Sequence, residues 1–147
     1  MIKYKKIEHD LLPLFQKLKE KLLQDKDILF AYLFGSYGRG NPHGLSDVDI
    51  AVYLGEARDF YLKKLELLEV INKTLLTDEV DLVILNQAPN YFQYEILQSA
   101  KLIFSRNDEK RIQFEVKTMK LYFDLEPLHR LAEKVLLNKI REGTYGY

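Results

Sequence analysis

Short apolar runs alternate along the chain with longer stretches in which leucines recur every three or four residues. The short runs predict strands and the periodic stretches predict helices, because side chains alternate faces in a strand and return to one face every three or four residues in a helix. Strands are expected at residues 28–34, 47–54, 79–85 and 102–104, and helices at residues 7–26, 59–73, 90–100 and 107–141. Elements in this order predict an α/β (α+β) fold in which helices flank one small mixed sheet.

Two prolines set expectations for the helices that contain them. Because proline lacks an N–H and clashes with the preceding turn, Pro13 is tolerated only near the start of the first helix, and Pro127 should kink or split the last one. The last helical segment also carries Tyr122, Phe123 and several leucines. We expect these side chains to be core, the alternative being a face for a second copy of the chain or for a partner protein.

The composition is that of one soluble domain, which we expect to span residues 1–147, since 47% hydrophobic residues are enough for a core. The 22 basic and 22 acidic residues cancel, which argues against broad nucleic-acid binding. The chain has no cysteine, which excludes thiolate metal sites and cysteine nucleophiles. No apolar run approaches the roughly 18 residues of a membrane helix, and no signal-type segment opens the chain. A cytoplasmic location without membrane contact is expected.

Aspartates interrupt two of the predicted strands. Since strand side chains alternate, Asp47 and Asp49 share one face, while the apolar residues between and after them point into the core. Asp81 occupies the outward face at the start of a later strand; Asp78 and Glu79 are its local rivals, but they lie outside the apolar run. If the two strands are neighbours, Asp47, Asp49 and Asp81 form one cluster.

Three neighbouring carboxylates repel one another, so the pKa of at least one is expected to rise unless a cation lies among them. Ligands that are all oxygen select hard cations such as magnesium, which takes the rest of its shell from water and substrate phosphates. The sequence therefore predicts a magnesium site at Asp47, Asp49 and Asp81, with a phosphate-binding segment beside it.

The segment after the first strand has the features of a phosphate site. Gly35-Ser36 closes that strand and opens a short helical turn, with Ser36 at the expected N-cap position. Backbone N–H groups at such a turn and the Ser36 hydroxyl would bind phosphate oxygens. Arg39, one turn later, is either a phosphate clamp or a solvated surface residue. Ser46 either contacts the site or only hydrogen-bonds the strand start, and His43 is expected to be a bystander.

These residues resemble a known signature. Gly35-Ser36, ten intervening residues and Asp47-Val48-Asp49 resemble the motif of the DNA polymerase beta-like nucleotidyltransferase superfamily, and Asp81 matches its third carboxylate. With Arg39 and Ser46 included, the pattern is most similar to the minimal nucleotidyltransferases, the MntA-type antitoxins of HEPN/MNT toxin–antitoxin pairs.

The resemblance covers residues 28–85 and is specific because the motif lies on strand, turn and strand. It implies a polymerase beta-like nucleotidyltransferase fold, with a catalytic core at about residues 28–104 and C-terminal helices at about residues 107–141. One position departs from the pattern: Gly38 stands where these proteins often have alanine. Glycine there is expected to loosen a helical turn slightly without removing any chemistry.

The resemblance implies two-metal nucleotidyl transfer from ATP. Asp47 and Asp49 would ligate two magnesium ions, and Asp81 would complete the site of the ion that activates the acceptor hydroxyl and help to take its proton. Gly35, Ser36, Arg39 and Ser46 would hold the nucleotide. In this family the acceptor is a tyrosine of a HEPN toxin, a small helical RNase that AMPylation silences, so the implied partner is such a toxin.

Two other functions stay open on the residues alone. One is a small-molecule nucleotidyltransferase of the aminoglycoside-resistance kind, although the chain offers no second domain for a drug unless a homo-oligomer supplies one. The other is an antitoxin that neutralises its partner by steric contact, with catalysis dispensable.

Overall fold

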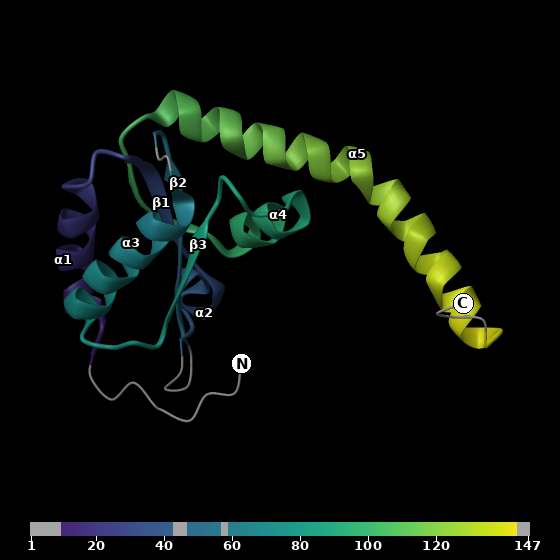
Figure 1. The fold of residues 1–147 in the computed structure, drawn as a ribbon, viewed down its shortest axis with the longest axis horizontal. Coiled ribbons are helices and arrows are strands. Elements are labelled where there is room, and N and C mark those ends of the chain that lie inside the picture. Colours follow the sequence, from purple (N-terminus) through teal and green to yellow (C-terminus); the bar gives the residue numbers. More distant parts are fainter. Residues whose placement is uncertain (1–9, 43–46, 57–58, 144–147) are drawn as a thin grey trace.

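The computed structural model describes residues 10–42, 47–56 and 59–143. A four-stranded sheet in the order β3-β2-β1-β4 carries helices on both faces (Figure 1). The strands are β1 (Ile28–Phe34), β2 (Val48–Leu54), β3 (Val80–Ile84) and β4 (Lys101–Ser105), and the helices are α1 (Leu12–Leu23), α2 (Gly35–Arg39), α3 (Phe60–Leu75), α4 (Asn90–Ser99) and α5 (Asp108–Arg141). Strand β1 is antiparallel to β2 and β4, whereas β2 and β3 are parallel. The predicted α/β fold with a small mixed sheet is confirmed.

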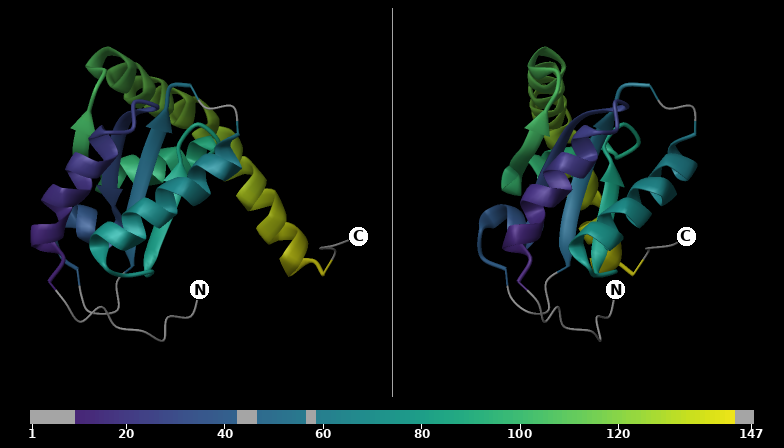
Figure 2. Two further views of the ribbon diagram at one scale, coloured as in Figure 1. Left: turned by 60° about the vertical axis from the view of Figure 1, so that its left-hand side comes forward. Right: turned by 90° about the vertical axis from the view of Figure 1, so that its left-hand side faces the viewer.

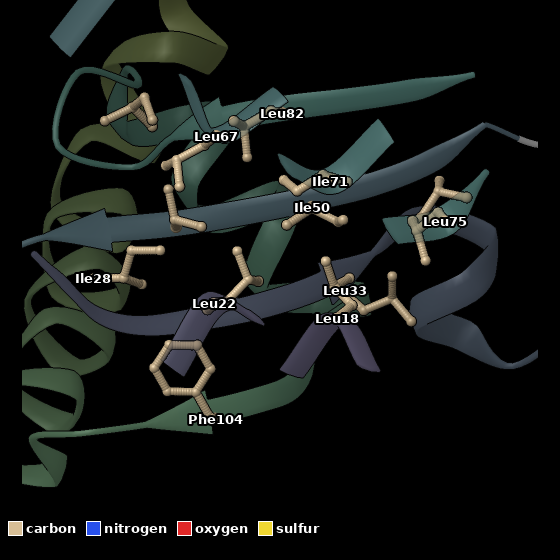
Figure 3. Close-up of a cluster of buried hydrophobic side chains, with 14 of the residues drawn as sticks. Leu18, Leu22, Ile28, Leu33, Ile50, Leu67, Ile71, Leu75, Leu82 and Phe104 are labelled. Carbon is tan, nitrogen blue, oxygen red and sulfur yellow. The ribbon is translucent and has the colours of Figure 1, made fainter. Parts of the chain in front are cut away.

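The larger core lies between the sheet and helices α1 and α3 (Figure 3). Leu18 and Leu22 of α1 and Ile71 of α3 are fully buried there, which explains the three- and four-residue leucine spacing of these helices. Helix α1 begins beside Pro13, as expected for a residue that fits only the first turn. The strands contribute alternate residues, among them Val48, Ile50 and Val52 of β2, each at 0% exposure.

The opposite face of the sheet packs against α4 and the first half of α5. Half of its buried side chains are aromatic and come from β1, with Phe30 and Tyr32 in one cluster with Ile96 of α4. Phe114 anchors α5 here, its ring centroid lying 5.7 Å from that of Phe30 and 5.3 Å from that of Tyr53. The aspartates of β2 alternate with its core residues, so they lie on this α4 and α5 side of the sheet.

Helix α5 corrects two expectations. It is one continuous helix of 34 residues with Pro127 inside it, so the chain has no separate C-terminal helices at this point. A single proline removes one backbone hydrogen bond and bends a helix without ending it, and Figure 1 shows the axis changing direction in the second half. The leucines expected to be core are exposed, Leu128 at 62% and Leu131 at 59%, as is Phe123 at 61%. Tyr122 is half-buried and stacks on Tyr94, with ring centroids 3.7 Å apart.

Within the described residues, no helix has the length and apolarity needed to cross a membrane.

Candidate active site

The predicted carboxylates lie where the two parallel strands begin. Asp49 of β2 and Asp81 of β3 are direct partners in the parallel ladder, and Asp47 immediately precedes β2. Val48, between the first two, is fully buried in the larger core, so alternation places Asp47 and Asp49 together on the other face. The fold thus brings all three candidate metal ligands to one end of the sheet.

The electrostatics of Asp81 show how close the three carboxylates lie. The pKa of Asp81 is raised above its ordinary value, first by loss of solvent around its carboxyl and then by the negative charge of Asp47 and a hydrogen bond with it. A hydrogen bond with Asp49 and the cation of Lys64 act in the opposite direction. The carboxylates of Asp47, Asp49 and Asp81 are therefore crowded together at this end of the sheet, as their positions in the sequence predict.

The donor chemistry fits a hard divalent cation, because the three side chains supply only oxygen and their mutual repulsion is what such an ion relieves. Among the described residues, no set of three or more metal-ligating side chains is arranged as a ready-formed metal cluster. The assignment of Asp47, Asp49 and Asp81 as ligands therefore rests on strand register and electrostatics.

Gly35 packs directly over Asp49. Its φ of +65° lies in the left-handed region, and a Cβ added there would collide with Oδ2 of Asp49 and lie 3.2 Å from its Cγ. Its N–H donates a 3.0 Å hydrogen bond to Oγ of Ser99, a residue that is 7% exposed. Glycine is thus required here twice, by the backbone conformation and by the neighbouring carboxylate.

Ser99, which the sequence analysis missed, and Gly38, which it expected only to loosen the turn, support this segment. Ser99 ends α4, and its hydroxyl accepts from Gly35 and donates to the carbonyl oxygen of Ile96 at 3.5 Å. Gly38 permits the close approach of α2, since a Cβ there would collide with the carbonyl oxygen of Ser99 and lie 2.7 Å from that of Leu33. Glycine is therefore required at position 38 for the close packing of α2 against these carbonyl oxygens, because the methyl group of alanine has no room there.

Ser36 lies inside α2, half-buried, and its predicted N-cap role is wrong. The N-cap position belongs to Phe34, which makes no side-chain cap. The backbone carbonyl of Ser36 accepts instead from Asn41 at 3.1 Å, which closes the turn. A phosphate-binding role for the Ser36 hydroxyl stays a prediction.

Arg39 is the last residue of α2 and is exposed, four residues beyond Gly35. Its role as a phosphate clamp also stays a prediction. Ser46 and His43 lie outside the described residues.

A family model described as Polymerase beta, Nucleotidyltransferase matches residues 16–109, which include every candidate site residue. The chain belongs to this nucleotidyltransferase family. A curated relative, the protein adenylyltransferase MntA of Shewanella oneidensis, is 33% identical over 129 residues, which cover 86% of this chain and 91% of the relative. The expected kinship with MntA-type nucleotidyltransferases is confirmed, and the protein is an enzyme of the nucleotidyltransferase class.

Solved structures of related proteins share the fold. A toxin–antitoxin crystal structure with AMP-PNP has a TM-score of 0.69 at 27% identity and covers 85% of this chain and 97% of its own. A crystal structure of a mutant MntA toxin–antitoxin has a TM-score of 0.69 at 29% identity, with 83% and 97% covered. The polymerase beta-like nucleotidyltransferase fold expected from the Gly-Ser and Asp-x-Asp motif is confirmed.

Proposed function

We propose that this chain is a protein adenylyltransferase antitoxin, which transfers AMP from ATP to a tyrosine of a HEPN toxin and thereby neutralises it. The observation that carries the proposal is the in-register pair Asp49 and Asp81, with Asp47 beside them and Gly35 packed over Asp49. The relationship to MntA supports AMP as the transferred group and a protein as its acceptor. The toxin–antitoxin neighbours support a toxin as that protein.

In this proposal Asp47, Asp49 and Asp81 hold two magnesium ions. When bound, these ions supply Lewis-acid charge that stabilises the attacking and leaving oxygens of an in-line displacement. Asp81 takes the proton of the acceptor hydroxyl. It suits this task because it is exposed on the edge strand β3, where a protein acceptor can reach it.

The reaction forms a bond between the tyrosine oxygen and the α-phosphorus of ATP and breaks the bond from that phosphorus to pyrophosphate. Ser36 and Arg39 hold the triphosphate during this exchange, with Ser46 as a further contact, and Gly35 positions their turn, since its own N–H is donated to Ser99. The hydrogen bond from Gly35 to buried Ser99 fixes the turn, so the phosphate-binding backbone is positioned before the nucleotide arrives.

A labelling experiment tests the proposal. Purified chain, magnesium and a purified HEPN protein from the same genome are incubated with ATP labelled at either the α- or the γ-phosphate. Transfer of α-label only, lost in Asp47→Asn and retained in Asp78→Asn, is the expected result. Asp78 is the matched control, since it is an exposed acid two residues before β3.

Other results point to other functions. Transfer of γ-label only would mean phosphoryl transfer and refute the mechanism. Release of pyrophosphate with an aminoglycoside as the only acceptor would indicate a small-molecule enzyme. Full neutralisation of the toxin in cells by a folded Asp47→Asn variant would show a steric antitoxin.

A further inference from the structure

The second half of α5 is a helical arm without any covering structure in the part of the chain described here. Every residue from 127 to 143 is exposed. Figures 1 and 2 show this arm, residues 127–141, leaving the body beyond α4 and running, well apart from the sheet, down to the level of α2. Strands β2 and β3 begin at that level, and the arm lies on the same side of the sheet as the carboxylates.

The arm has the apolar spacing of a helix that packs against another surface. Leu128, Leu131, Ala132, Val135 and Leu136 follow the i, i+3, i+4, i+7, i+8 pattern of a buried helix face. Four of the five side chains are large and exposed: Leu128 at 62%, Leu131 at 59%, Val135 at 46% and Leu136 at 43%. We call these five residues the arm stripe.

The arm stripe continues the face by which α5 packs on the body. Seven-residue steps lead from Phe114, packed against the sheet, through Leu121 to Leu128 and Val135 of the stripe. Residues seven apart are rotated by only about 20° about the helix axis, so the same apolar face continues beyond the last contact of α5 with α4. A helical segment of this length is only marginally stable without packing partners, because most helical stability comes from packing of an apolar face. We therefore expect another molecule to cover the apolar face that extends beyond the body of the domain.

The charge of the arm indicates what kind of molecular surface can cover the arm stripe. Residues 127–141 hold Arg130, Lys134, Lys139 and Arg141 against one carboxylate, Glu133, in a chain whose net charge is zero. Arg130 is paired with Glu126 just before the arm, its Nη2 lying 2.6 Å from Oε2. With Glu126 and Glu142 at its two ends counted as well, the arm holds four cations and three carboxylates, so a small positive excess favours a partner surface with acidic residues.

We propose that the arm is the docking element for the protein acceptor, with its stripe covered by an apolar helical face of the toxin that carries acidic residues at its rim. This rests on the function proposed above. The arm stands apart from the body on the carboxylate side of the sheet and extends to the level of α2, so a protein that binds the arm and reaches back to the body can present a tyrosine to the carboxylates.

The test compares two matched variants of the full chain. In the first, Leu128→Gln, Leu131→Gln and Val135→Gln together replace the centre of the arm stripe with residues of similar helix propensity. In the second, Ile112→Gln, Val116→Gln and Met119→Gln change three similarly exposed apolar residues on the outward face of the same helix. Calorimetric titration gives the Kd for the HEPN toxin, and steady-state AMP transfer gives KM and kcat. Far-UV circular dichroism checks that helix content is retained.

The arm variant is expected to raise both Kd and the KM for toxin about tenfold or more, because central apolar anchors dominate an interface. Its kcat should stay within about twofold, since the catalytic end is unchanged. The outward variant should leave all three constants within about twofold of wild type. An unchanged Kd in the arm variant, or an equal loss in the outward variant, overturns the proposal.

Other occupants give other results. A wild-type dimer in sedimentation that the arm variant dissociates, with toxin binding unaffected, assigns the stripe to a second copy. Binding of wild type to anionic phosphatidylserine vesicles, lost in the arm variant with toxin binding unaffected, assigns it to a lipid surface. Failure of the proposed function can be distinguished from failure of the docking proposal, because the wild-type chain would then transfer no AMP even when the toxin is bound at saturation.

Discussion

Replacing Gly35 with alanine tests the contact that positions Asp49. Two costs add at this residue. A φ of +65° costs a residue with a Cβ about 1–2 kcal/mol. The Cβ also collides with Oδ2 of Asp49, and displacing a side chain in such an overpacked contact costs about 1–3 kcal/mol more. We expect Gly35→Ala to lower the free energy of unfolding by about 2–5 kcal/mol, the sum of the two.

Gly40 provides the matched control. Its φ is +81°, but a Cβ there meets nothing within 4 Å, so Gly40→Ala carries only the backbone cost of about 1–2 kcal/mol. Urea unfolding measures both variants. Activity separates them further, since a displaced Asp49 should reduce kcat about a hundredfold in Gly35→Ala, whereas Gly40→Ala should keep kcat near wild type.

A double variant isolates the contact. Asp49→Ala removes the Oδ2 and Cγ that the new Cβ would meet, so Gly35→Ala in that background should cost no more than Gly40→Ala. Equal free-energy costs for Gly35→Ala and Gly40→Ala in the wild-type background, with activity retained in both, would refute the reasoning.

Three further predictions follow from the contacts. Because the pKa of Asp81 is raised in the metal-free fold, its ionisation lowers stability as pH rises, so in magnesium-free buffer Asp81→Asn should raise the urea midpoint at pH 7 and leave it unchanged near pH 3; a lower midpoint at pH 7 would contradict this. Gly38→Ala should lower the free energy of unfolding by about 1–3 kcal/mol through collision with the carbonyl of Ser99, although alanine is the better helix former, and a stabilised variant would show that α2 has room to move. Tyr32→Phe removes the 3.1 Å hydrogen bond to Glu115 that ties β1 to α5, and should cost about 1–3 kcal/mol in urea unfolding, whereas an unchanged midpoint would mean that Arg111 alone holds Glu115.

The strands and the carboxylate face were predictable because they depend on local pattern. The apolar run 28–34 has the bounds of β1, and alternation around Val48 places Asp47 and Asp49 on one face without knowledge of the neighbouring strand. The parallel partnership of Asp49 with Asp81 was a hypothesis, since it depends on which strands become neighbours.

Long-range contacts explain what the sequence did not reveal. Ser99 supports Gly35 from 64 residues away, and the close approach at Gly38 depends on the same helix end. The periodicity of α5 predicts a helix with an apolar face, but it gives no sign whether that face covers the protein's own core or another molecule. The leucines beyond Pro127 were therefore assigned to the wrong environment.

The most direct test of the account is the mass of the toxin after reaction. Purified HEPN toxin, incubated with ATP, magnesium and the wild-type chain, should gain the mass of one or more AMP groups, located on a tyrosine by peptide mapping. Asp49→Asn should abolish the gain while the complex still forms, and Asp78→Asn should preserve it. An unmodified toxin in a complex with wild-type chain and ATP, or a gain of phosphate in place of AMP, would contradict the central claim.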